Sequence, residues 1–269
     1  MTVGDAPVIE LQGVGKTYGH VTALDDVSLA IGRGETVILL GLSGSGKTTL
    51  LRHLNGLEPP STGRVRVLGT DVVGLAGRKL RALRRRIGFV FQQFELVGRL
   101  TVLENVLTGS LATLRGPRVG VWSYPRAYRL EALGRLDRVG LLDRAYQRAD
   151  TLSGGQQQRA AIARALMQRP EILLADEPVA SLDPESSDQV MALLREIAVD
   201  SALTVVCSLH QVDLALAFGQ RIVGLRHGRI VLDTPAAGLT HAAAMEVYGR
   251  VMDPVQGIAG RPAAGSAGP

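Results

Sequence analysis

A glycine-dense turn between a short apolar strand and a helix constrains the fold of this chain more than any other feature. Residues 36–40 (TVILL) form a β-rich run, the turn GLSGSGKT follows at 41–48, and a helix is expected from Lys47 to about Asn55. The turn matches the pattern G-x-x-x-x-G-K-[ST] in the strand-to-helix context that this pattern requires. Its glycines let backbone amides point at phosphate oxygens, and the helix N-terminus adds positive potential. The turn therefore predicts an α/β fold with a phosphate-binding site.

Two side chains of the turn have distinct expected roles. Lys47 should bridge the β- and γ-phosphates of a nucleoside triphosphate, and the Thr48 hydroxyl should ligate Mg²⁺. The alternative is a glycine-rich turn with a chance lysine, which the flanking strand and helix disfavour. The formal net charge of +5 fits a polyphosphate ligand, an anionic membrane face or nucleic acid, and does not choose among them.

Two adjacent carboxylates end a second apolar run, ILLADEP at 172–178. The C-terminal edge of a parallel sheet is where ligands bind, so both carboxylates are candidate site residues. Asp176 fits a Mg²⁺ role through water, and Glu177 would polarise the attacking water. Alone, such an acidic strand end is often only a solvated loop or a helix cap. Together with the phosphate-binding turn, it indicates hydrolysis of a nucleoside triphosphate.

Strand signals that alternate with helical signals favour a mainly parallel sheet covered on both faces. Strands are expected at residues 8–12, 21–31, 36–40, 64–68, 87–91, 171–175, 203–207 and 221–225. A last hairpin at 225–232 should turn at His227-Gly228. From about 101 to 167 the signals are mostly helical, broken by a loop at 115–125. The prediction is a P-loop NTPase core with an N-terminal antiparallel β subdomain and an inserted α-helical lobe.

Composition excludes several classes of protein. The single cysteine, Cys207, cannot form an intramolecular disulfide, and its β-rich surroundings indicate a buried small hydrophobe. No apolar run approaches the ~20 residues of a membrane span, and residues 1–10 lack the basic start and apolar core of a signal peptide. The chain is thus expected neither to span nor to cross a membrane. The basic helix expected at 77–86 has no interleaved aromatic residues, so a solvated face is favoured over nucleic-acid binding.

The pentapeptide Leu152-Ser153-Gly154-Gly155-Gln156 is the most specific motif of the chain. On this motif the chain resembles the ATP-binding cassette (ABC) ATPases, whose signature is LSGGQ, over about residues 8–250. The resemblance implies a RecA-like core at about 8–98 and 170–250, a helical lobe at about 99–169, and a disordered tail at 251–269. Further family marks are Tyr18 for the aromatic that stacks on adenine, Gln92 for the Q-loop glutamine, Ser181-Leu182-Asp183 for the D-loop and His210 for the switch histidine.

The resemblance also implies the site residues of an ATP hydrolase that uses Mg²⁺. Catalysis is expected from Glu177, His210 and Lys47. Metal binding is expected from Thr48, Gln92 and Asp176. ATP contacts are expected from Tyr18, Gly41, Leu42, Ser43, Gly44, Ser45, Gly46, Lys47, Thr48, Thr49, Gln92, Ser153, Gly154, Gly155, Gln156 and Asp183. A signature on a separate lobe cannot reach its own phosphate loop, so the resemblance implies a head-to-tail homodimer with each ATP between two copies.

Longer stretches resemble the ATP-binding subunits of phosphonate importers. They are FQQFELVGRLTVLENVL, YQRADTLSGGQQQRAAIARALMQ, DEPVASLDP and SLHQVDLA. This resemblance implies a subunit at the cytoplasmic face of the cell membrane that binds integral membrane permease subunits and works with a separate substrate-binding protein. Segment 92–105 is expected to line the docking groove between core and lobe, with Phe94, Leu96 and Val97 exposed.

The alternatives concern what ATP hydrolysis drives. An importer or exporter of another cargo, such as phosphate, phosphite, an amino acid or a lipoprotein, would carry the same motifs. A non-transport ABC ATPase acting on DNA or ribosomes is disfavoured, because such chains usually carry two cassettes or a long coiled-coil insertion. A regulatory protein whose ATP site only switches binding is disfavoured by the intact Glu177 and His210.

Overall fold

The computed structural model describes residues 6–114, 116 and 119–248, so the tail predicted at 251–269 lies outside the described residues. The strands are β1 (Ile9–Tyr18), β2 (Val21–Ile31), β3 (Thr36–Leu40), β4 (Thr62–Val67), β5 (Thr70–Asp71), β6 (Ile87–Val90), β7 (Ile172–Asp176), β8 (Thr204–Leu209), β9 (Arg221–Arg226) and β10 (Arg229–Pro235). The α-helices are α1 (Lys47–Leu54), α2 (Gly77–Arg84), α3 (Val102–Thr108), α4 (Arg126–Arg138), α5 (Gly154–Leu166), α6 (Pro184–Asp200), α7 (Val212–Phe218) and α8 (His241–Met245).

A six-stranded sheet in the order β10-β9-β3-β8-β7-β6 forms the centre of the molecule. Its strands are parallel except for β10, which pairs antiparallel with β9 through the predicted hairpin. Residues of β3, β7 and β8 are almost all buried, as expected for parallel strands covered on both faces. The mainly parallel sheet is therefore confirmed. The C-terminal ends of β3 and β7 lie at one edge, where the phosphate loop and the two carboxylates follow.

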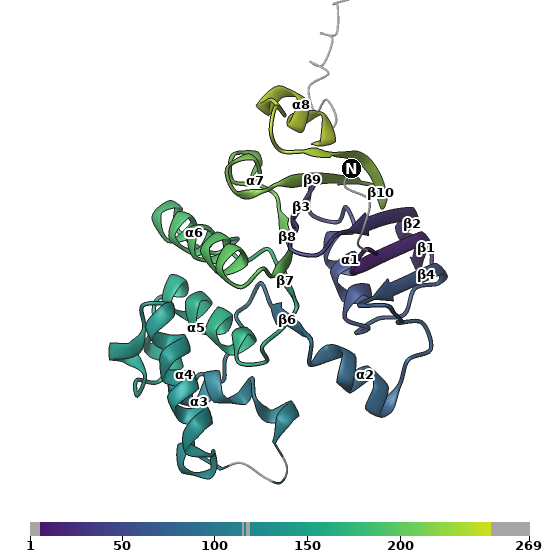
Figure 1. Cartoon of the computed structure of the whole chain (residues 1–269). Helices are drawn as coiled ribbons and strands as arrows, with labels where there is room; N and C mark the ends of the chain where they lie inside the picture. The colour runs from purple at the N-terminus through teal and green to yellow at the C-terminus, as the bar shows by residue number, and fades with distance from the viewer. Residues whose placement is uncertain (1–5, 115, 117–118, 249–269) are drawn as a thin grey trace, which may run out of the picture.

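Alternate residues of the central strands face two separate hydrophobic clusters. On β3, Leu39 packs with α1 and the N-terminal sheet, whereas Ile38 and Leu40 pack on the side of α6 and α7. Figure 1 shows this layering, with α6 and α7 on one side of the central sheet and α1 with β1, β2 and β4 on the other. The sheet thus holds the phosphate loop between two packed layers.

A four-stranded sheet in the order β2-β1-β4-β5 forms the predicted N-terminal antiparallel subdomain. The two-residue strand β5 was not predicted. At Gly63 the chains of β1 and β4 approach so closely that an added Cβ would lie 2.3 Å from the Gly13 carbonyl oxygen, and its φ is +82°. Only glycine fits there. This sheet carries Tyr18 at the end of β1.

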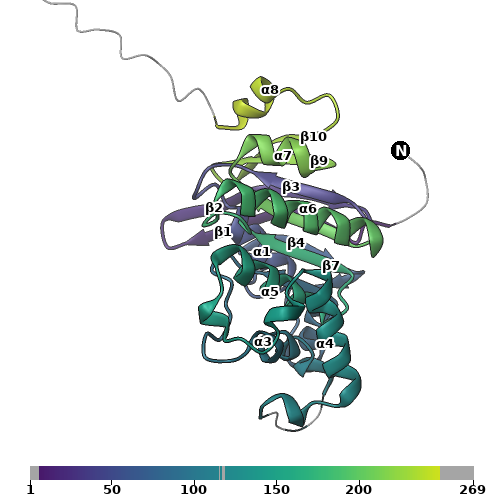
Figure 2. The same ribbon diagram turned by 90° about the vertical axis from the view of Figure 1, so that its left-hand side faces the viewer.

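Helices α3, α4 and α5 lie between β6 and β7 in the sequence and share a hydrophobic cluster that includes Leu103, Leu107 and Leu136. Figure 2 shows them together below the sheets. Thr101 starts α3 with a capping box, in which its side chain accepts from the Glu104 amide and the Glu104 carboxylate accepts from the Thr101 amide. The loop predicted at 115–125 contains a 3₁₀ turn at Val121–Ser123. Among the described residues, no helix has the length and apolar character needed to span a membrane.

Candidate functional site

The phosphate-binding turn leaves β3 and enters α1 as predicted. Gly46 has a φ of +106°, and a Cβ added there would lie 2.5 Å from the Ala23 carbonyl oxygen. The turn is held from the side by the amide of Gly228, which donates to the Ser45 carbonyl at 3.1 Å. The Ser45 hydroxyl is buried and has no hydrogen-bond partner among the described residues. An unpaired buried hydroxyl in a turn of this shape fits a phosphate oxygen as its partner.

Lys47 lies at the centre of the site, with only 3% of its side chain exposed. Its Nζ donates to the carbonyl oxygens of Gly41 at 2.7 Å and Leu42 at 3.1 Å. The same Nζ lies 3.3 Å from Oε1 of Glu177. The structure therefore brings together two residues predicted to be catalytic, from segments 130 positions apart. A buried ammonium needs such partners, because burying an unpaired charge is costly.

Asp176 ends β7 beside the first turn of α1. Its Oδ1 accepts from the Thr48 hydroxyl at 3.0 Å and from the Ser208 hydroxyl at 2.8 Å. Thr48 and Asp176 were predicted to bind Mg²⁺, and both offer oxygen ligands next to a phosphate loop. Mg²⁺ is usually held by one or two carboxylates together with substrate phosphates, so this donor set fits the ion. Among the described residues, no group of three or more His, Cys, Asp or Glu side chains is arranged to hold a metal.

Glu177 follows Asp176 in a left-handed backbone conformation, with a φ of +44°. Such a value is uncommon for a residue that is not glycine, asparagine or aspartate. Its amide donates to the Ser208 hydroxyl at 2.8 Å. The chain thus turns at the end of the strand and presents both neighbouring carboxylates on the side of the phosphate loop, as the sequence predicts.

Tyr18 lies at the end of β1 with 42% of its surface exposed. Lys16 Nζ lies 5.0 Å from the centre of this ring and 3.4 Å from Oε1 of Glu58. Partial burial and the neighbouring Glu58 carboxylate raise the pKa of Tyr18. Lys16 and Glu58 were not predicted from the sequence, since charged residues beside a loop carry no distinguishing signal.

The remaining predicted residues lie at the ends of strands and helices. Gln92 follows β6 and His210 follows β8, and both side chains are exposed. The His210 carbonyl accepts from the Tyr248 hydroxyl at 2.6 Å, and burial raises the pKa of Tyr248 to about 12. Asp183 caps α6 by accepting from the Ser186 amide at 2.9 Å.

The signature sequence begins α5 in the helical lobe. Ser153 caps the helix and forms a capping box with Gln156. Gly155 packs closely against Ser186: a Cβ added to this glycine would lie 2.9 Å from the Ser186 hydroxyl oxygen. No hydrogen bond or ion pair of the described structure joins residues 153–156 to residues 41–48. That the signature acts on the phosphate loop of another copy stays a prediction.

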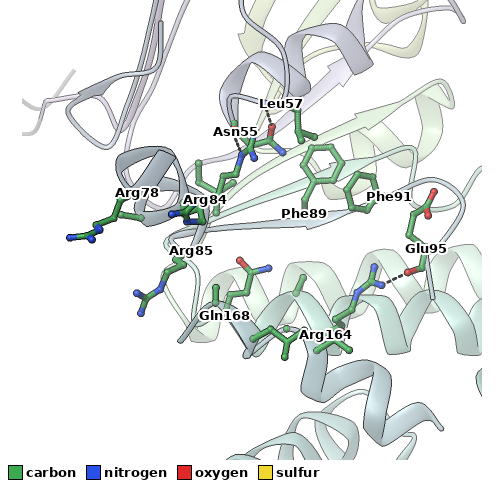
Figure 3. Close-up of a pocket in the computed structure, with 18 residues that line it drawn as sticks. Asn55, Leu57, Arg78, Arg84, Arg85, Phe89, Phe91, Glu95, Arg164 and Gln168 are labelled. Atoms are coloured by element: carbon green, nitrogen blue, oxygen red, sulfur yellow. Dashed lines mark hydrogen bonds between the residues drawn. The ribbon is translucent and has the colours of Figure 1, made fainter. Parts of the chain in front are cut away.

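A groove of about 630 Å³ lies between the core and the helical lobe. Figure 3 shows Phe89 and Phe91 on the core side, facing Arg164 and Gln168 of the helical side. The two phenyl rings lie 4.3 Å apart. Four arginines of and next to α2 also line the groove: Arg78, Arg81, Arg84 and Arg85.

The prediction for the lining of this groove was wrong for most of segment 92–105. Of that segment only Glu95 lines the groove. Phe94 and Glu95 both have left-handed φ values, +55° and +52°. Phe94 packs near Gly154, and Leu96 packs against the cluster of the helical lobe. Val97 is 54% exposed but lies outside the groove.

The site and the lobe together define an ATP-binding, ATP-hydrolysing cassette. Its marks are the phosphate-binding turn, the pairing of Lys47 with the strand-end Glu177, and the LSGGQ signature on the helical lobe. A model of the ABC transporter family matches residues 24–180. The chain belongs to the ABC transporter family as an ATP-binding subunit, and within it to the group of phosphonate import ATP-binding proteins.

Relatives match nearly the whole chain. The phosphonates import ATP-binding protein PhnC of Frankia casuarinae is 63% identical over 93% of this chain and 99% of its own. The phosphate-import ATP-binding protein PhnC of Mycolicibacterium smegmatis is 61% identical over 92% and 94%. The hypophosphite import ATP-binding protein HtxD of Stutzerimonas stutzeri is 49% identical over 89% and 70%.

Solved cassettes share the fold. The dimeric structure of a post-hydrolysis state of the ATP-binding cassette MJ0796, bound to ADP and Pi, is 38% identical, with a TM-score of 0.76 over 86% of this chain and 100% of that chain. A second dimeric structure of MJ0796 is 39% identical, with the same TM-score and coverage. The predicted fold class is therefore confirmed.

Proposed function

We propose that this chain hydrolyses ATP to power the import of phosphonates, or of a related phosphorus oxyanion, across the cytoplasmic membrane. The observation that carries the proposal is the identity of 59–63% to three import ATP-binding proteins, over 90–93% of this chain. Two of them are named for phosphonates and one for phosphate, and a further relative is named for hypophosphite. These cargoes share a phosphorus centre with anionic oxygens. None of the residues of the ATP site serves to choose among them.

The ATP site supports a hydrolysis mechanism with named roles. A triphosphate that binds the loop competes for Lys47 with Glu177 and with the carbonyls of Gly41 and Leu42. Once Lys47 contacts the phosphates, the Glu177 carboxylate is released to accept a hydrogen bond from the attacking water. General-base help of this kind typically contributes ~10²–10⁴-fold to the rate. Positioning of the phosphates and stabilisation of charge supply the rest.

Thr48 and Asp176 would hold Mg²⁺, which when bound neutralises charge on the phosphates. Gln92 and His210 are proposed to contact the ion and the γ-phosphate respectively. Tyr18 would stack on the adenine ring, with Lys16 behind it. These roles rest on the positions of the residues at the sheet edge and on the matching motifs.

A second copy of the chain is proposed to complete each site. The capped N-terminus of α5 places Ser153 at an exposed surface of the helical lobe, with Gly154 partly exposed beside it. Helix N-termini bind anions, so this surface suits the γ-phosphate of an ATP held by another copy. The dimeric MJ0796 cassettes support the arrangement. Asp183, exposed at the start of α6, would lie at the same interface.

Membrane subunits are proposed to dock in the groove between core and lobe. The floor offers the Phe89 and Phe91 rings, and arginines of α2 stand at its edge. An apolar side chain flanked by a carboxylate would satisfy both features. This docking would place the chain at the cytoplasmic face of the membrane. A separate substrate-binding protein is proposed to select the cargo.

An uptake experiment tests the proposal. A strain that lacks the gene receives the wild-type chain, Glu177→Gln, or Glu196→Gln, which changes an exposed glutamate of α6. We expect growth on methylphosphonate as sole phosphorus source with the wild type and the Glu196 variant only. If the Glu177 variant loses only phosphate or phosphite uptake, the cargo is that oxyanion. Unchanged uptake of all three compounds would contradict a transport role.

A further inference from the structure

Ser208 is a buried hydroxyl in an otherwise apolar stretch of β8, TVVCSL. None of its surface is exposed. In the parallel register, Ser208 lies opposite Asp176 of β7, and Figure 1 shows the two strands side by side. Its Oγ donates to Oδ1 of Asp176 at 2.8 Å and accepts from the amide of Glu177 at 2.8 Å. One hydroxyl therefore connects the two acidic residues of the site.

The bond to the Glu177 amide has a specific structural consequence. Glu177 is the first residue after β7, whose pairing with β8 ends at Asp176 and Ser208, and it has a left-handed φ of +44°. The partly buried amide of Glu177, at the start of this turn, donates to the Ser208 hydroxyl. Backbone strain of this kind persists where the surroundings hold it, and it is frequent at active sites. In this backbone conformation, Oε1 of Glu177 lies 3.3 Å from Lys47 Nζ.

We propose that Ser208 is a positioning residue for Glu177, which holds the left-handed turn and thereby the direction of the catalytic carboxylate. The inference rests on the catalytic role proposed for Glu177, and it is independent of the cargo. Ser208 acts through the main chain and touches neither the nucleotide nor the attacking water.

The two bonds of Ser208 are not equivalent. Asp176 retains the Thr48 hydroxyl on the same Oδ1 when Ser208 is removed. The Glu177 amide has no second acceptor among the described residues. A partly buried amide that loses its partner is unfavourable, so the turn should relax towards an ordinary conformation. Removal of the Ser208 hydroxyl should therefore displace Glu177 and slow the chemical step. The residues that hold the phosphates should keep their contacts.

The test measures kcat for ATP and the Kd of ATP for the purified full-length chain. Ser208→Ala should lower kcat roughly ten- to a hundredfold, since a hydrogen bond of this strength no longer holds the carboxylate in place. The Kd of ATP should not rise, and it should fall by no more than about tenfold, because a displaced Glu177 competes less for Lys47. Cys207→Ala is the matched control, because it removes one buried atom from the neighbouring residue on the other face of the strand. It should leave kcat unchanged.

A double-mutant cycle separates positioning from a merely structural role. In the Glu177→Gln background, Ser208→Ala should cause no further loss of turnover, because its effect passes through the carboxylate already removed. Additive losses of turnover would overturn the inference, as would a weakening of ATP binding that matches the loss of kcat. Wild-type turnover of Glu177→Gln alone would instead overturn the role of Glu177. If Ser208→Ala does not fold, Ser208→Cys weakens the acceptor without opening a void, and normal kcat there would also overturn the inference.

Discussion

Replacing Glu177 with glutamine should abolish most turnover and tighten ATP binding. The reason for the second effect is the ion pair between Glu177 and Lys47, whose atoms lie 3.3 Å apart with little of either side chain exposed. At an effective dielectric constant of about 20, the gross attraction of two unit charges at this distance is about 5 kcal/mol. A triphosphate that recruits Lys47 must overcome this attraction.

Only part of that attraction is recovered in the variant. Glutamine keeps an oxygen beside Lys47, and the ammonium also retains the carbonyls of Gly41 and Leu42. We therefore expect the binding free energy of ATP to improve by about 1.4 kcal/mol, which corresponds to roughly tenfold tighter ATP binding. Loss of the general base should lower kcat by ~10²–10⁴-fold.

Titration calorimetry with ATP gives the affinity, and release of inorganic phosphate gives kcat. Glu196→Gln, the same substitution at an exposed position of α6, is the control for both assays. Weaker ATP binding in Glu177→Gln would show that the ion pair does not compete with the nucleotide. Turnover within tenfold of the wild type would refute the role of Glu177 as general base.

Three further changes test single contacts of the structure. Lys47→Ala should weaken ATP binding roughly 10–100-fold, because charge-assisted bonds to the phosphates are lost, and unchanged affinity in calorimetry would count against the phosphate loop. Thr101→Ala removes the cap of α3 and should lower the free energy of unfolding in urea by about 1 kcal/mol. Hydrogen bonds from Arg169 lower the pKa of Glu131 below its ordinary value of 4.5, against the opposing effect of burial. The stability from this pair is thus present above that value and lost as the pH falls through the lowered pKa. Arg169→Gln should therefore flatten the fall of the urea midpoint below pH 4.5, and an unchanged acid profile would contradict the pairing.

Features carried by consecutive residues were predicted well from the sequence. The phosphate loop, the hairpin that turns at His227-Gly228 and the apolar strands β3, β7 and β8 lie where the sequence places them. Their signals are local: glycines at fixed spacing, a turn dipeptide and short apolar runs. The strand end at Asp176 and Glu177 belongs to the same class, because the chain must turn there to present two neighbouring side chains on one side.

Features set by the packing of distant segments were not predicted. Two consecutive left-handed residues, Phe94 and Glu95, lie in the segment that was expected to line the groove, and neither residue type favours that conformation. The groove instead takes its aromatic floor from β6 and the residue just after it, Phe91, and its basic edge from α2 and the adjacent Arg85. Lys16 and Glu58 likewise meet beside Tyr18 only because β1 and the loop before β4 are adjacent in the fold.

Ser208 owes its place in the site to the fold and not to a local motif. In the sequence it is one serine in an apolar strand, with no motif to mark it. The strand order β8-β7 and the register that pairs it with Asp176 place its hydroxyl between the two acidic residues. The motif residues supply the chemistry of ATP hydrolysis, whereas sheet register supplies the hydrogen bond that holds the Glu177 turn. The left-handed backbone at Glu177 therefore depends on a hydrogen bond from the neighbouring strand β8. The same strand leads to His210, two residues after Ser208, so one strand positions two of the predicted catalytic residues.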